Sequence, residues 1–172
     1  MRELIIFGRS PFINRLNLSN IDYDKFDILC INKQIEGLKR VDFLVSADEW
    51  VKPKLSVETE WISVHNNWNI IKTEKIIREE KKLSWKHYSS DLAVNFAILR
   101  GYKTIYLAGI DLVEDDKPFY HYDGVMNTRK ASADGCRDEK EHIKLLAKLA
   151  NVKLYQLNPD SDWLEYRDIG IL

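Results

Sequence analysis

The sequence has 172 residues, of which 45% are hydrophobic and 31% charged; these values fit one globular domain, residues 1–172, and exclude a disordered chain. The formal net charge of −1 excludes a global basic field for nucleic-acid binding, and no apolar run approaches the roughly 18 residues of a membrane span. The N-terminus has no signal-peptide pattern, and Cys30 and Cys136 have no metal-type spacing, so we expect a cytoplasmic protein with reduced thiols.

Short apolar runs in the first 64 residues predict buried strands, at positions 4–7, 27–32, 41–46 and 60–64. The first of these strands leads directly into the turn Gly8-Arg9-Ser10-Pro11. A glycine after a buried strand allows a tight turn whose amides can face a phosphate, and Arg9 would add a bidentate contact. An ordinary strand-ending turn has the same pattern, so the residues alone leave both interpretations open.

The second half of the chain alternates helices and strands. Apolar periodicity predicts helices at 89–100 and 139–150, and apolar runs predict strands at 103–108 and 152–157. Ser89 and Ser90 stand at the start of the first helix, where they can cap the helix or help its free N–H groups bind an anion. Residues 127–138 show no periodicity and are interpreted as a loop that closes over a ligand, with Arg129 and Lys130 as phosphate clamps.

This order of elements predicts an α/β fold with a doubly wound, mainly parallel sheet. In such sheets ligands bind beyond the carboxyl ends of the strands. Polar residues follow most of the predicted strands and should converge at that edge: Ser10, Asn32, Ser46, Asp48, Asn66, Asp111 and Asn158.

Two further segments carry candidate chemistry. Gly109-Ile110-Asp111 ends a central strand, where a carboxylate can bind a ribose or a metal, or cap the following loop. His121 lies between tyrosines, is followed closely by an aspartate, and is a candidate general acid or base. A histidine in such a loop can equally be packed or exposed without a catalytic role.

Several segments together resemble a known group of proteins. They are the serines before the alanine-containing helix at 88–97, the strand at 101–111 that ends in Gly-Ile-Asp, the opening turn at 8–12, Cys30-Ile31-Asn32, and the closing segment at 157–161. In this order they resemble bacterial sialyltransferases of the ganglioside-mimic type and the related domains similar to 6-hydroxymethylpterin diphosphokinase.

The resemblance implies a Rossmann-like fold that binds a nucleotide-linked donor. It implies donor contacts at Ser10, Asn32, Ser89 and Ser90, to which the residue patterns add Gly8, Arg9, Gly109 and Asp111. It also implies a CMP-sugar as substrate, with no metal and no other cofactor required. Three departures concern the chemistry: Ser10 replaces a glycine, the family's tyrosines fall near Val113 and Phe119, and Asp134 stands where the family has its catalytic histidine.

The first functional hypothesis is therefore a metal-independent glycosyltransferase that uses a nucleotide-activated sugar. His121, Asp48 or Asp134 would deprotonate the acceptor hydroxyl. The acceptor is open among a small molecule, a glycan and a modified DNA base of the kind found in phages, and homo-oligomer formation is also open. The alternatives are a Mg²⁺–ATP-dependent pyrophosphokinase-like enzyme, using Asp111, Asp115 and Asp116, and a non-catalytic nucleotide-binding protein.

Overall fold

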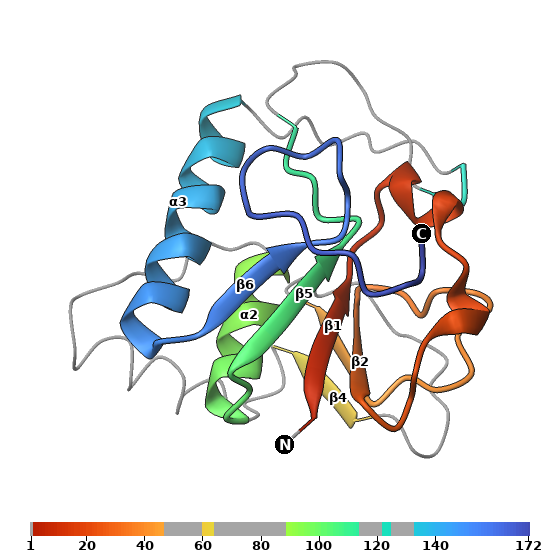
Figure 1. Ribbon diagram of the computed structural model, residues 1–172. Coiled ribbons are helices and arrows are strands. Elements are labelled where there is room, and N and C mark those ends of the chain that lie inside the picture. Colours follow the sequence, from red (N-terminus) through yellow and green to blue (C-terminus); the bar gives the residue numbers. More distant parts are fainter. Residues whose placement is uncertain (1, 47–59, 64–88, 114–121, 125–132) are drawn as a thin grey trace.

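A six-stranded parallel sheet, in the order β4-β3-β2-β1-β5-β6, forms the centre of the part of the chain described by this computed structural model, residues 2–46, 60–63, 89–113, 122–124 and 133–172 (Figure 1). The strands are β1 (Glu3–Phe7), β2 (Phe26–Ile31), β3 (Phe43–Ser46), β4 (Glu60–Ser63), β5 (Thr104–Ala108) and β6 (Lys153–Gln156). The helices are α2 (Ser89–Leu99), α3 (Ala133–Ala150) and two 3₁₀ helices, η1 (Pro11–Arg15) and η2 (Leu18–Asn20). The predicted doubly wound, Rossmann-like α/β fold is confirmed.

The two faces of the sheet are covered differently. Helices α2 and α3 pack on one face, where their apolar side chains join those of alternate strand residues such as Leu4, Ile6 and Leu107. The 3₁₀ segments, residues 35–41 and the C-terminal tail cover the other face, where Ile5, Phe7 and others point. All apolar residues of β1 have no exposed surface, because this central strand is buried on both sides.

The helix ends follow from local sequence. Gly101 has φ +87°, and the N–H groups of Gly101 and Tyr102 donate to the carbonyls of Ile98 (3.0 Å) and Ala97 (3.1 Å). This is the Schellman arrangement, in which a glycine adopts the left-handed conformation that ends a helix. The predicted stop of the first helix is therefore confirmed, and Tyr102 is delivered directly to the start of β5.

The start of α3 corrects one prediction. Residues 133–138 were interpreted as the end of a ligand-closing loop, but they form the first turns of α3. These turns carry mostly polar side chains, so apolar periodicity does not reveal them; only Cys136 and Glu139, three residues apart, are buried. Residues 127–132, including Arg129 and Lys130, lie outside the described residues.

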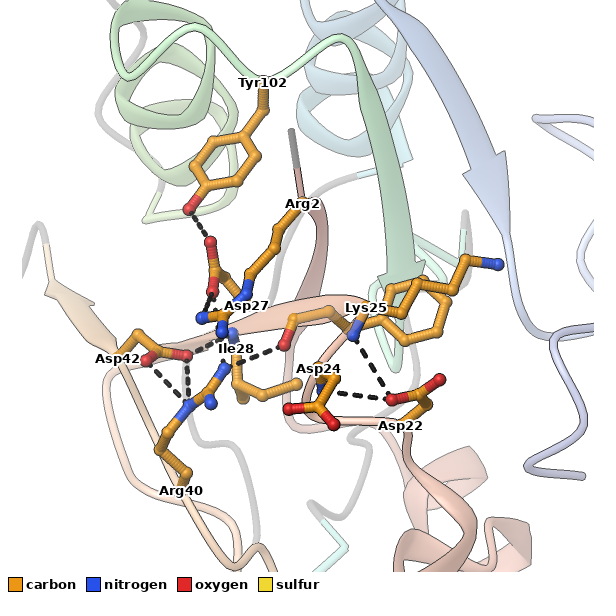
Figure 2. Close-up of polar contacts among 10 residues, drawn as sticks. Arg2, Asp22, Asp24, Lys25, Asp27, Ile28, Arg40, Asp42 and Tyr102 are labelled. Atoms are coloured by element: carbon orange, nitrogen blue, oxygen red, sulfur yellow. Dashed lines mark hydrogen bonds and ion pairs between the residues drawn. The ribbon is translucent and has the colours of Figure 1, made fainter.

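A dense polar cluster ties the amino ends of the strands together, opposite the carboxyl edge of the sheet (Figure 2). The Asp27 carboxylate accepts hydrogen bonds from Tyr102 Oη (2.6 Å), Arg2 Nη1 (3.0 Å) and Arg40 Nη2 (3.3 Å). Asp42 accepts from Arg40 Nε and from the backbone N–H of Ile28. The pKa of Tyr102 is raised, first by burial and then by its hydrogen bond to Asp27. These charges are satisfied by one another, which indicates a structural clamp.

No helix in the part of the chain covered by the structure is long and apolar enough to cross a membrane.

Candidate functional site

The carboxyl ends of β1 and β5 meet at the centre of the sheet, at the point where the strand order reverses. In register, Phe7 at the end of β1 lies between Cys30 of β2 and Ala108 of β5. The chain turns away to β2 on one side of β1, while β5 and β6 extend the sheet on the other side. Open α/β sheets bind their ligands at the carboxyl ends of the strands, where the strand order reverses in this way.

Two glycines allow the two strand ends to come this close. The Gly8 N–H donates to the Ala108 carbonyl at 2.7 Å, and the Ser10 N–H donates to the Gly109 carbonyl at 3.1 Å. A Cβ on Gly8 would lie 2.3 Å from the Gly109 carbonyl oxygen. Gly109 has φ +67°, and a Cβ there would lie 2.7 Å from Ile13 Cδ1. Packing within the protein therefore explains both glycines, and their use as ligand contacts stays a prediction.

Asp111 connects three strand ends at this edge of the sheet. One carboxylate oxygen accepts a hydrogen bond from Ser10 Oγ, after β1, and the other accepts from Asn158 Nδ2, after β6, at 3.0 Å. The Ser10 hydroxyl also accepts the Phe12 N–H at 3.2 Å and so caps η1. Three of the polar residues predicted to converge at this edge thus form one network, which we call the Asp111 bracket.

Asn32 and Ser89 form a second contact at the same edge. Asn32 follows β2 with φ 64°, a left-handed conformation that asparagine tolerates better than most residues. Ser89, the first residue of α2, donates from Oγ to Asn32 Oδ1 at 3.0 Å. The hydroxyl at the amino end of α2 and the amide at the end of β2 therefore face each other, and their use as ligand contacts stays a prediction.

Ser90 points elsewhere, toward α3. Its hydroxyl donates to Glu139 Oε1 at 2.6 Å, and the same oxygen accepts the Asp91 N–H at 2.9 Å. Asp91 Oδ2 lies 3.6 Å from His142 Nε2, and both side chains are buried. Glu139 thus caps the first turn of α2 from the neighbouring helix. The sequence reading missed Glu139 and His142, although their spacing of three residues on one helix face was a usable signal.

Arg9 and Lys33 lie at the ends of β1 and β2 and both bind Asp123. Arg9 Nη2 lies 3.0 and 3.2 Å from the two Asp123 oxygens, and Lys33 Nζ lies 2.9 Å from one of them. The hydrogen bond to Asp123 raises the pKa of Lys33. Residues 122–124 are held further by Tyr122, whose N–H donates to the Arg9 carbonyl at 2.9 Å. Burial raises the pKa of Tyr122. Neither Lys33 nor Asp123 was predicted as a site residue.

Of the three candidate general bases, the structure describes Asp134. Asp134 lies in the first turn of α3, with 87% of its side chain exposed and Arg137 Nη1 at 3.3 Å. His121 and Asp48 lie outside the described residues, as do Asn66, Asp115 and Asp116. Ser46, predicted to join the site, is fully buried at the end of β3. In the ranges that the structure covers, no three His, Cys, Asp or Glu side chains gather in a group that could hold a metal ion.

Solved structures of bacterial sialyltransferases are similar to this fold. The sialyltransferase CstII from Campylobacter jejuni, in complex with the substrate analogue CMP-3FNeuAc, is 18% identical with a TM-score of 0.56, covering 99% of this chain and 90% of that one. CstII in complex with cytidine-5′-monophosphate is 17% identical with a TM-score of 0.59, covering 98% and 86%. CST-II in complex with a trisaccharide acceptor and CMP is 15% identical with a TM-score of 0.59, covering 99% and 90%.

These likenesses establish the fold, because they extend over nearly the whole chain. The sequence identity is low, so they establish the fold alone. They support a sialyltransferase-like fold and give no support to the pterin diphosphokinase side of the resemblance. No protein-family model matches the sequence, and no curated relative matches it.

Proposed function

We propose that this protein is a glycosyltransferase that binds a nucleotide-activated sugar at the carboxyl edge of its sheet. The observation that carries the proposal is the convergence of Ser10, Asp111 and Asn158 with the facing pair Asn32–Ser89. These polar groups surround the point where the strand order reverses, in a fold that resembles sialyltransferases along 99% of this chain.

The nucleotide is assigned to the groups that lie near the amino end of α2. The Ser89 hydroxyl and the Asn32 amide meet there and offer both donors and acceptors, while the Asp91 N–H of the same helix start is already bonded to Glu139. Ser10, Arg9, Gly8, Gly109 and Asp111 form the opposite wall. Ser90 supports this arrangement indirectly, because its hydroxyl is bonded to Glu139 and holds α2 against α3.

The reaction we propose is displacement at the anomeric carbon of the donor sugar. The acceptor hydroxyl oxygen forms the new glycosidic bond, the bond between that carbon and the phosphate oxygen breaks, and the nucleotide leaves with the electron pair. The acceptor proton goes to a carboxylate or imidazole, for which Asp134, His121 and Asp48 are the candidates. Protein N–H groups at the carboxyl edge of the sheet, together with Arg9, stabilise the negative charge on the leaving phosphate.

The proposal extends to the sugar donor, the acceptor and the cellular location. CMP-sugar is the first donor to test, because the similar structures were solved with CMP or a CMP-sugar analogue. The acceptor is a glycan, a small molecule or a modified DNA base. We place the protein, as one domain over residues 1–172, in the cytoplasm, where the buried thiols of Cys30 and Cys136 stay reduced.

Calorimetric titration of CMP, CMP-sugar, UDP-sugar and Mg²⁺–ATP, with EDTA added for the sugar nucleotides, tests the proposal. Asn32→Gly leaves the backbone free to adopt φ 64° while it removes the whole side chain and its amide, so it tests the side-chain contact without backbone strain. Asn32→Gly and Ser89→Ala should each weaken sugar-nucleotide binding about 3- to 10-fold, the effect of one hydrogen bond. Lys103→Gln, exposed just before β5 at the amino edge, is the control and should bind normally. A strict requirement for Mg²⁺–ATP would overturn the proposal in favour of a pyrophosphokinase.

A further inference from the structure

Asp123 is held at the carboxyl edge of the sheet by two cations from distant parts of the chain. Arg9 follows the end of β1 and Lys33 follows the end of β2, and both donate to the Asp123 carboxylate at 2.9 to 3.2 Å. The Arg9 and Asp123 side chains are only 21% and 15% exposed. This is a partly desolvated charge cluster, in which interactions are stronger than on an open surface.

The donors of this cluster outnumber the acceptors that Asp123 supplies. Two cations face one carboxylate, and the acidic side chain that also acts on Tyr122, Glu36, is exposed. Arg9 Nε and Tyr122 Oη are both buried and have no hydrogen-bond partner among the described residues. Native proteins rarely leave such groups unsatisfied, so the cluster has spare capacity for oxygen acceptors.

The position of the cluster connects it to the proposed site. Arg9 is next to Ser10 of the Asp111 bracket, and Lys33 is next to Asn32, whose amide faces Ser89 at the start of α2. The guanidinium fork of arginine binds carboxylate and phosphate with the same geometry. The phosphate monoester of CMP also offers three terminal acceptor oxygens where a carboxylate offers two, so it could reach Arg9 Nε and Tyr122 Oη as well.

We propose that Arg9, Lys33 and Tyr122 form a phosphate subsite, and that Asp123 is a built-in competitor for it. The phosphate of a nucleotide ligand takes the Arg9 and Lys33 donors from the Asp123 carboxylate. That the ligand is a nucleotide rests on the proposed function. That the subsite binds a phosphate rests on the charge cluster alone.

The test compares nucleotides with nucleosides in a set of matched variants. Calorimetry gives the Kd of CMP and of cytidine for the wild type, Asp123→Asn, Arg9→Gln, Lys33→Gln and the control Lys103→Gln. Asp123→Asn removes the competing charge at constant shape and should tighten CMP binding at least threefold. Arg9→Gln and Lys33→Gln should weaken CMP binding at least tenfold, and cytidine binding should be the same in all five proteins. Circular dichroism confirms that each variant is folded.

Inorganic phosphate, titrated by thermal shift, separates this inference from the proposed function. If CMP binds equally well to all five proteins, the proposed site stands and the phosphate subsite is wrong. If phosphate stabilises the wild type and Asp123→Asn but not Arg9→Gln, while no nucleotide binds, the subsite stands and the proposed function is wrong. Weaker CMP and phosphate binding by Asp123→Asn would overturn the competition, because Asp123 would then support the ligand. Stabilisation by free N-acetylneuraminate but not by phosphate would show a carboxylate site and overturn the assignment to phosphate.

Discussion

Replacing Asp111 by alanine should destabilise the protein by about 3 kcal/mol. The Asn158 contact is the more costly loss, since Asn158 is only 7% exposed and its amide would be left buried without its acceptor. A hydrogen bond to a charged group contributes roughly 1.5–3 kcal/mol, and a buried amide left without its acceptor is the expensive case. The Ser10 hydroxyl is partly exposed and can bind water instead, so its contact adds only about 0.5–1.5 kcal/mol.

Urea unfolding followed by circular dichroism measures this effect, with equal m-values required for the comparison. In a chain of this length, about 3 kcal/mol corresponds to a fall in Tm of roughly 6–12 °C. Asp111→Asn keeps one acceptor oxygen but turns its amide N–H toward one of the two donors, Ser10 or Asn158. It should therefore lower the free energy of unfolding by about half as much as Asp111→Ala. Asp162→Ala, at an exposed acidic residue of the same C-terminal segment, is the control and should change stability by less than about 0.5 kcal/mol. If Asp111→Ala were as stable as this control, the bracket would not join the strand ends as described.

Three further predictions concern the scaffold around the site. Gly109→Ala should cost about 2–4 kcal/mol in urea unfolding, because φ is +67° and the new methyl would meet Ile13 at 2.7 Å; an unchanged midpoint would contradict the packing. Tyr102→Phe should cost about 1–2 kcal/mol by removing the hydroxyl that donates to Asp27, and no loss would show that this part of the amino-edge clamp is not needed. Burial raises the pKa of Cys30 from 9.0 to about 12, so the unfolded chain loses its thiol proton first and stability falls as the pH rises from about 9 toward 12. The decline should be up to about 1.4 kcal/mol per pH unit steeper in the wild type than in Cys30→Ala, and equal slopes would contradict it.

The central strands were predictable because they contain short, nearly continuous apolar runs. Buried parallel strands need no alternation, and runs such as 4–7 and 104–108 therefore stand out from the polar loops between them. The start of α3 was not predictable in the same way. Its first turns bury only Cys136 and Glu139, so the apolar pattern begins after the helix does.

The site residues that follow strands were predictable. The contacts between residues far apart in the sequence were not. Ser10, Asn32, Asp111 and Asn158 each follow a strand, and parallel topology brings such residues together. The contact between Arg9 and Asp123 joins residues 114 positions apart, and no local pattern encodes it. The pattern of tyrosine, histidine and aspartate suggested His121 as a general base. The structure instead places the nearby Asp123 at the sheet edge.

The central claim is that a nucleotide binds at the carboxyl edge of the sheet without a metal. NMR of the ¹⁵N-labelled protein, titrated with CMP in the presence of EDTA, tests it most directly. The account predicts the largest shifts in the backbone amides of Ser10, Asn32 and Ser89, with those of Asp27 and Arg40 at the amino edge unchanged. Shifts confined to the amino edge, or no shifts at millimolar CMP and CMP-sugar, would contradict it.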